Sequence, residues 1–253
     1  MSAAERPGVL AFDLDGTLLD AVGEPAPGIV EALHDLTASG VLLVPCTGRP
    51  LRGALRAAAL LEASPAACVA YHGALVTDVA TGRWLRHLSL PAGLTARLAR
   101  RALDDGLDVS LYVGDERVDL TPRDSASPPE GSPGVTRLVL AGEPARVTTS
   151  MSLLDEACAS GLRLEPVQPG VVVVLPGAAD KGDGLRLVVG HLGADPFRAV
   201  ACGDTTNDIT LLLAAAHGIA VGDAPPELSR VADVTVAQKE LAGTLRAVFA
   251  RLG

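Results

Sequence analysis

The stretch Val9-Leu10-Ala11-Phe12-Asp13-Leu14-Asp15-Gly16-Thr17 decides both the fold and the chemistry expected of this chain. Its four leading apolar residues predict a buried β-strand, and two carboxylates follow where that strand would leave its sheet. A carboxylate beside an apolar strand is costly unless something pairs with it. Mg²⁺ is the expected partner, because it typically binds one or two carboxylates together with phosphate oxygens. We therefore expect the chemistry to centre on Asp13.

Two plainer interpretations compete for the same acidic pair. A calcium-binding loop starting at Asp13 would reach Glu24 at its twelfth position, but Leu18 stands where the sharp turn needs a glycine. A surface turn built on aspartate and glycine remains open. The other motifs of the chain have to decide between this turn and a catalytic site.

Length, charge and hydropathy narrow the class of protein. The 253 residues, 48% of them hydrophobic, allow one large domain or two small ones. The net charge of −9 disfavours nucleic acid and anionic membranes as partners. The apolar run at 171–175 is too short to span a bilayer, and Asp13 and Asp15 interrupt the apolar core that a signal peptide would need. We expect a cytoplasmic monomer or homodimer.

The four cysteines show no metal-binding pattern. Cys46, Cys68, Cys158 and Cys202 are far apart and lack the close pairs of zinc sites. Because each lies in or beside an apolar stretch, we expect four buried free thiols.

Strand and helix patterns alternate in the first third of the chain. A helix over Ala26–Ser39 precedes a strand at Val41–Val44, and a second helix reaching Leu60 or Leu61 precedes a strand at Ala67–Tyr71. This alternation predicts an α/β fold, a Rossmann-like parallel sheet with helices on both faces.

The pattern changes between residues 78 and 176. Strands with one wet face, two helices and a long polar loop predict an inserted α+β domain, with the core formed by 1–77 and 177–253. In the insert we expect strands at Arg83–Leu88 and Val109–Val113, helices at Ala92–Asp105 and Glu143–Ser160, and the loop at Thr121–Gly134. Alternation then resumes, with helices at Lys181–Leu192, Asp208–Ala215 and Leu241–Leu252 and strands at Ala199–Cys202, Gly218–Val221 and Val231–Val236.

Thr47 stands directly beyond the second predicted strand, in Thr47-Gly48-Arg49-Pro50. It could cap the following helix, with Pro50 early in that helix. It could also bind phosphate, since free backbone N–H groups at a helix N-terminus attract anions. The two roles are compatible.

Lys181 opens a predicted helix in Asp180-Lys181-Gly182-Asp183-Gly184. A lysine in the first turn faces the positive end of the helix dipole, so an anion is expected to compensate it. The plainer alternative is a solvated surface lysine. Two nearby glycines weaken a purely structural role, because they lower helix stability.

The stretch Gly203-Asp204-Thr205-Thr206-Asn207-Asp208 follows another buried strand and begins another helix. Thr205 and Asp208 have the spacing of a capping box, which accounts for those two residues. Asp204 remains as an additional acid at the carboxyl end of a strand, the edge where open α/β sheets bind ligands.

These motifs together resemble a known family. Asp13-Leu14-Asp15-Gly16-Thr17, Thr47-Gly48-Arg49, Lys181-Gly182 and Gly203-Asp204-x-x-Asn207-Asp208, in that order and separated by a long insert, are similar to the four motifs of the haloacid dehalogenase-like superfamily. The similarity is to its Cof-like branch of sugar-phosphate phosphatases, which carry a large cap domain between the second and third motifs. One departure is His72 before Gly73-Ala74, where many relatives have asparagine. This histidine is either a structural hydrogen-bonding group or a pH-dependent substrate contact.

The resemblance implies a Mg²⁺-dependent phosphatase for a small phosphorylated metabolite, such as a sugar or polyol phosphate. It implies that Asp13 is the nucleophile that forms an aspartyl-phosphate and that Asp15 is the general acid and base. The remaining expectations are Mg²⁺ bound by Asp13, the Asp15 backbone carbonyl, Asp204 and Asp208; phosphate held by Thr47, Gly48, Lys181 and Asn207; and substrate contacts from Arg49 and His72. A phosphomutase on the same scaffold and a non-catalytic sugar-phosphate-binding protein are the alternatives.

Overall fold

The computed structural model describes residues 6–124, 131–149 and 151–252. The chain divides into two compact units, one formed by Met1–Leu85 with Asp180–Gly253 and the other by Arg86–Ala179. The second unit is inserted in the sequence of the first, so the first is built from two separate stretches of chain. Within the described residues, no helix is both long and apolar enough to cross a bilayer.

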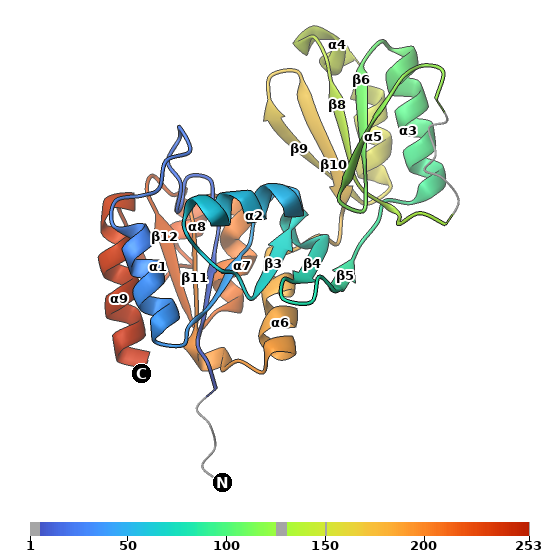
Figure 1. Ribbon diagram of the computed structural model, residues 1–253. Helices are drawn as coiled ribbons and strands as arrows, with labels where there is room; N and C mark the ends of the chain where they lie inside the picture. Colours follow the sequence, from blue (N-terminus) through green and yellow to red (C-terminus); the bar gives the residue numbers. More distant parts are fainter. Residues whose placement is uncertain (1–5, 125–130, 150, 253) are drawn as a thin grey trace. The chain divides into compact units, whose positions relative to one another are not determined.

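The core of the first unit is a five-stranded sheet in which every strand is parallel to its neighbours. The predicted α/β fold is confirmed, and both sequence segments contribute to one sheet (Figure 1). In spatial order the strands are β13 (Val234–Val236), β12 (His217–Val221), β11 (Ala199–Gly203), β1 (Val9–Phe12) and β2 (Leu42–Pro45).

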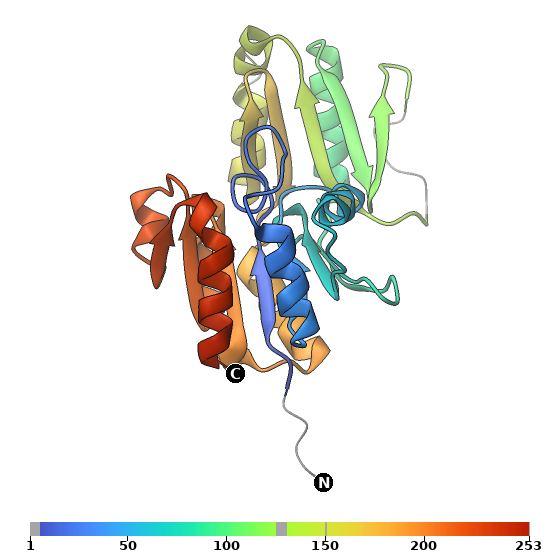
Figure 2. The same ribbon diagram turned by 60° about the vertical axis from the view of Figure 1, so that its left-hand side comes forward.

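Helices cover both faces of this sheet. Figures 1 and 2 show α1 (Ile29–Ala38) beside α9 (Leu241–Leu252) on one face, with α6 (Lys181–Leu192) and α7 (Ile209–Ala214) on the other. Side chains of β1 alternate between the faces, and those of Val9 and Ala11 join the cluster that contains buried side chains of α6. β1 is therefore buried on both sides, which explains its unbroken apolar run. The same unit also contains α2 (Leu51–Leu60) and the single-turn α8 (Pro226–Ser229).

The third predicted strand lies parallel beside β2 but belongs to a second, smaller sheet. β3 (Ala67–Ala70) pairs antiparallel with β4 (Leu75–Asp78) in a three-stranded sheet completed by β5 (Trp84–His87). At the edge of the main sheet, a parallel bridge joins Cys46 to Val69, and backbone hydrogen bonds run from Thr47 N to Val69 O at 2.8 Å and from Ala66 N to Leu43 O at 3.0 Å. The sequence pattern predicted no pairing of β3 with β4, which forms because the backbone at 71–73 turns sharply with positive φ and returns the chain to β3.

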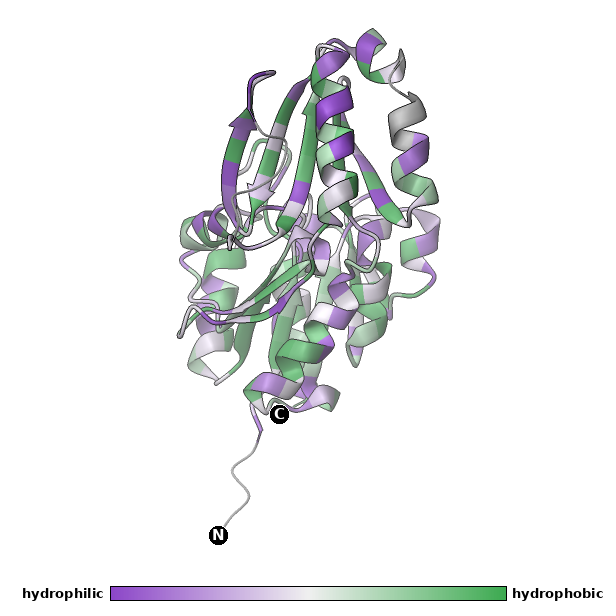
Figure 3. Cartoon of the chain, turned by 90° about the vertical axis from the view of Figure 1, so that its right-hand side faces the viewer, coloured by the Kyte–Doolittle hydropathy of each residue, from purple (hydrophilic) through white to green (hydrophobic). Residues whose placement is uncertain are grey.

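The second unit is a five-stranded antiparallel sheet with α3 (Ala92–Asp104) and α5 (Met151–Ala159) packed on one face. Its strands are hydrophobic on the helix-facing side, and Figure 3 shows the mixed hydropathy of the helices above them. The spatial order is β7 (Glu116–Leu120), β6 (Asp108–Val113), β8 (Val135–Ala141), β10 (Val171–Pro176) and β9 (Leu162–Gln168), and the helices are α3 (Ala92–Asp104), α4 (Pro144–Thr149) and α5 (Met151–Ala159).

Parts of one predicted helix and of one predicted loop in the insert lie outside the described residues, and one cysteine is not buried as expected. Of the helix expected over Glu143–Ser160, the described stretches Pro144–Thr149 (α4) and Met151–Ala159 (α5) are helical, and residue 150 lies outside the described residues. Residues 125–130 of the expected loop Thr121–Gly134 also lie outside them. All four cysteines are free, but Cys158 is exposed, because it faces outward from α5 while Ala157 packs into the core.

Candidate active site

Three strand ends create the site. The chain leaves β1 for β2 on one side and later returns to β11 on the other, so β1 lies at the point where the strand order reverses. Ligands bind outside the carboxyl ends of the strands at such a point. Asp13 directly follows β1, Thr47 comes two residues after β2, and Asp204 directly follows β11.

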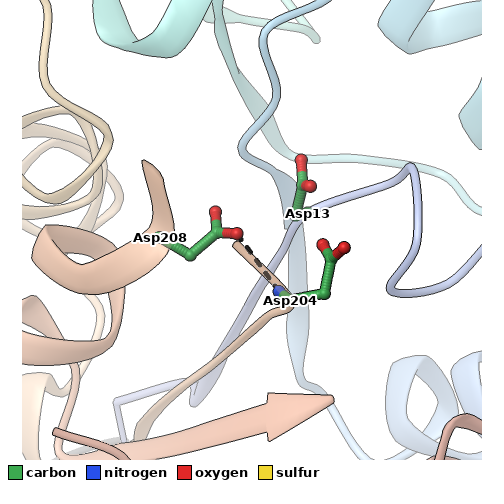
Figure 4. A group of neighbouring side chains, drawn as sticks. All are labelled: Asp13, Asp204 and Asp208. Carbon is green, nitrogen blue, oxygen red and sulfur yellow. Dashed lines mark hydrogen bonds between the residues drawn. The ribbon is translucent and has the colours of Figure 1, made fainter. Parts of the chain in front are cut away.

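Three carboxylates gather at this edge. Asp13, Asp204 and Asp208 each offer an oxygen, and these oxygens lie within 4.8 Å of one another. Figure 4 shows the three side chains grouped around one space beyond the strand ends. Asp208 is fully buried and Asp13 is 7% exposed, so water screens their mutual repulsion poorly.

Lys181 supplies a positive charge that offsets the repulsion between these carboxylates. Its ammonium Nζ lies 3.0 Å from Asp13 Oδ1 and 2.6 Å from Asp208 Oδ1. Burial opposes the charged form of the amine, but Asp13 and Asp208 outweigh it and raise the pKa of Lys181. The lysine is therefore a buried cation, and the alternative of a solvated surface lysine is wrong.

One ammonium does not balance three carboxylates. The pKa of Asp13 is raised to about 7, chiefly by burial; Lys181 lowers it, whereas Asp208 and Asp204 add to the rise. Burial also raises the pKa of Asp204. A second cation would relieve this deficit, and a set of carboxylate oxygens suits a hard divalent ion. The residues present therefore fit Mg²⁺.

Glycines allow the acids to approach one another. Gly16 has φ +81, and a Cβ at this position would lie 2.1 Å from Asp204 Oδ2. Thr17, the next residue, donates from Oγ1 to Asp204 Oδ1 at 2.9 Å. On the other side, a Cβ on Gly203 would lie 2.4 Å from Asp208. Any larger residue at either glycine would displace a carboxylate of the cluster.

Asp208 performs the capping role and also belongs to the cluster. The capping box with Thr205 is present, and Asp208 Oδ2 accepts from the backbone N–H groups of Thr205 at 3.1 Å and Asp204 at 3.2 Å. Its Oδ1 accepts from Lys181. Both carboxylate oxygens thus already bind protein donors. Asn207 precedes it and is half-buried.

Asp15 points to a different partner. Its exposed carboxylate accepts two hydrogen bonds from Arg49, from Nε at 2.8 Å and from Nη2. Hydrogen bonding to Asp15 raises the pKa of the Arg49 guanidinium. The sequence analysis missed this pair. The available signal was that both residues follow adjacent parallel strands, β1 and β2, and so share one edge of the sheet.

Thr47 is buried and does not cap α2. The residue before the helix is Pro50, and Thr47 Oγ1 instead accepts from the backbone N–H of Arg49 at 3.2 Å. The capping alternative is wrong because two residues separate Thr47 from the cap position. Its carbonyl accepts from the backbone N–H of His72 at 3.0 Å.

His72 packs directly on the loop after β2. A Cβ on Gly48 would lie 2.2 Å from His72 Nε2, so the imidazole occupies the space that any other residue at 48 would need. His72 is 7% exposed and has φ +54, which is uncommon for a residue other than glycine. On the far side, a Cβ on Gly73 would overlap the backbone of Asp180. The turn at residues 71–73 therefore packs between the loop that contains Thr47 and Gly48 and the start of α6.

A family model of haloacid dehalogenase-like hydrolases matches residues 10–135 and 132–248. The chain belongs to this family. "Putative phosphatase YxeH" of Bacillus subtilis is 24% identical over 95% of this chain and 96% of its own. A haloacid dehalogenase-like hydrolase from Bacteroides thetaiotaomicron has TM-score 0.82 and 21% identity, over 98% of this chain and 100% of that one. The subclass IIB sugar phosphatase BT4131 has TM-score 0.73 and 17% identity, over 96% and 98% of the two chains.

Membership of the haloacid dehalogenase-like hydrolases agrees with the resemblance stated from the motifs. In this member of the family, Asp13, Lys181, Asp204 and Asp208 form one connected cluster. Asp15 and Arg49 form a separate pair, and Thr47, Gly48 and His72 form a packed group beside β2.

Proposed function

We propose that this hydrolase is a Mg²⁺-dependent phosphatase that acts on the phosphate ester of a sugar or polyol through an aspartyl-phosphate. The observation that carries the proposal is the buried Asp13 carboxylate, held against the Lys181 ammonium at the carboxyl edge of a parallel sheet. The names of the relatives agree with it, since YxeH is described as a phosphatase and BT4131 as a sugar phosphatase.

The reaction has two displacements at phosphorus. In the first, an Asp13 oxygen bonds to phosphorus, the ester P–O bond breaks, and Asp15 gives its proton to the departing alcohol oxygen. In the second, Asp15 takes a proton from water while that water oxygen bonds to phosphorus and the bond to Asp13 breaks. Inorganic phosphate leaves, and both aspartates return to their starting forms.

Asp13, the Asp15 backbone carbonyl and Asp204 would hold Mg²⁺, with Asp208 acting through water because its oxygens already accept protein hydrogen bonds. The ion would neutralise charge shared between the nucleophile and the substrate. The cluster's shortage of positive charge supports this assignment.

Thr47, Gly48, Lys181 and Asn207 would bind the phosphoryl oxygens. Lys181 is suited to this task because its ammonium is already desolvated and fixed by two carboxylates, so little reorganisation is needed when a third anion arrives. We assign Arg49 and His72 to substrate contacts beside Asp15 and Gly48, respectively.

The test is a phosphate-release assay across sugar and polyol monophosphates with p-nitrophenyl phosphate as an activated reference. Wild type should release phosphate with Mg²⁺ and lose activity when the metal is chelated, and Asp13→Asn should be inactive. Asp104→Asn, a change at an exposed acid of α3, is the matched control and should behave as wild type. Isomerised sugar phosphate in place of free phosphate would identify a mutase. Equal turnover by Asp13→Asn and wild type would refute the assignment of Asp13 as the nucleophile.

A further inference from the structure

Gln238 reaches from the end of the chain to the loop after β1. It opens the short 3-10 turn Gln238–Glu240, just before α9. Its side-chain nitrogen Nε2 lies 3.1 Å from the backbone oxygen of Thr17, 3.1 Å from that of Leu19 and 3.4 Å from that of Gly16. An amide has two N–H donors, so one of them is shared between two carbonyls. Three converging acceptors also fix which end of the amide faces the loop, because the amide oxygen would be repelled there.

The loop that Gln238 contacts is a tight turn outside the main sheet. Its own backbone hydrogen bonds lie mostly within it: Leu14 O accepts from the N–H groups of Thr17, Leu18 and Leu19, and Gly16 N donates to Leu19 O at 2.8 Å, while Leu18 O accepts from Ala26 N at 2.8 Å. Such bonds shape the turn, and the hydrogen bond from Thr17 Oγ1 to Asp204 is one attachment of it to the rest of the unit. Gln238 supplies another attachment from a segment more than two hundred residues away.

The same residues touch the acidic cluster with their other atoms. Gly16 lies against Asp204 Oδ2, and Thr17 Oγ1 donates to Asp204 Oδ1. The turn also begins immediately after Asp13 and Asp15. If the Gly16 and Thr17 carbonyls moved, the backbone that follows Asp13 and Asp15 would move with them. The contact of this backbone with Asp204 would then change as well.

The 3-10 turn itself does not depend on the Gln238 side chain. Its cap is made by Glu240, whose Oε2 accepts from the backbone N–H of Ala237 at 3.2 Å. The amide of Gln238 is thus directed to the loop rather than to its own turn.

We propose that Gln238 is a positioning residue that fixes the Gly16–Leu19 turn, and with it the relative placement of Asp13, Asp15 and Asp204. Its catalytic consequence rests on the proposed phosphatase function. Reversing the polarity of this contact should disturb the turn more than removing it, because a carboxylate would face three carbonyl oxygens.

The test compares Gln238→Glu, Gln238→Ala and the neighbouring exposed Lys239→Ala as the matched control. Hydrogen exchange of the amides in residues 14–19 should accelerate on the order of tenfold in Gln238→Ala and more in Gln238→Glu, while exchange in α9 stays unchanged. The kcat should fall on the order of tenfold in Gln238→Ala and on the order of a hundredfold in Gln238→Glu, with KM nearly constant. Lys239→Ala should match wild type in both measurements.

Wild-type exchange at residues 14–19 in Gln238→Glu would overturn the proposal, as would faster exchange spread equally over α9. A fall in kcat without any change in exchange would also overturn it. The exchange measurement needs no turnover. If wild type hydrolysed no phosphate ester, the phosphatase function would fail while the contact of Gln238 with the loop would still be decided.

Discussion

The buried charge cluster of the first unit contrasts with an exposed ion pair of the second. At the strand ends of the first unit, Lys181 and Asp208 are 2% and 0% exposed and come from separate elements. In the second unit, Arg117 and Asp119 pair at 2.7 Å on one strand, with 59% and 66% of their side chains exposed. Burying charge is costly and exposing it costs little. The buried ion pair, which costs more free energy to form, therefore marks where chemistry is expected.

The largest effect should follow loss of the buried cation. Lys181→Met leaves Asp13 and Asp208 without their shared partner, so the unfolding free energy should fall by about 3–5 kcal/mol. The kcat should fall roughly 10²- to 10³-fold, because a donor to the phosphoryl group is lost. Urea titration and phosphate release measure the two effects.

Arg117→Ala provides the matched control in the other unit. Removing one member of an exposed pair should cost less than about 1 kcal/mol. Equal losses of stability in the two variants would contradict the contrast between the units.

A smaller but still large effect is expected at Gly16. In Gly16→Ala the new methyl would overlap Asp204 Oδ2, so kcat should fall by about a hundredfold. Gly23→Ala separates this overlap from backbone strain, since Gly23 has φ +88 and nothing within 4 Å of a built Cβ. That control should lose roughly 1–2 kcal/mol of stability and no activity. Similar kcat values for the two variants would show that Asp204 has room to move.

The sequence was informative about this site where each residue followed a local pattern. Asp13 and Asp204 come directly after buried strands, and Lys181 opens a helix, so the topology alone brought them to one edge. The pairing of Arg49 with Asp15 depends on side-chain direction, which periodicity does not report. The contact of Gln238 with Thr17 spans 221 residues and belongs to no motif.

The hairpin of β3 with β4 escaped prediction for another reason. Its apolar run looks like that of any buried strand, and its direction is set by positive φ at Tyr71 and His72. Tyrosine rarely adopts that conformation, so the only strong sequence signal for the turn is Gly73, which also has positive φ.

The effect of Arg49 on kcat should be larger for substrates whose leaving group must take a proton from Asp15. Arg49→Met removes the two hydrogen bonds that hold the Asp15 carboxylate in place, so kcat for sugar phosphates should fall about tenfold because the general acid is no longer positioned. The kcat for p-nitrophenyl phosphate should change little, because its leaving group departs without protonation. A uniform fall across both substrates would assign Arg49 to phosphate binding instead.

The smallest effect concerns stability against pH in the metal-free protein. The pKa of Asp13 is raised to about 7 by burial, so its protonated form is favoured by folding. This stabilisation is complete below about pH 4 and is lost as the pH rises through 7. Thermal unfolding with a chelator should show it, and Mg²⁺ should raise the midpoint more at pH 8 than at pH 5. Asp13→Asn should flatten the dependence, and an unchanged slope in that variant would assign it to another group.

The most direct test of the account is to find where the phosphoryl group resides during turnover. Wild type mixed with Mg²⁺ and a sugar monophosphate, quenched in acid within one turnover and digested, should carry a phosphoryl group on Asp13 by peptide mass spectrometry. Asp13→Asn should carry none and release no phosphate. A phosphoryl group on any other residue, or phosphate release by Asp13→Asn at the wild-type rate, would contradict the account.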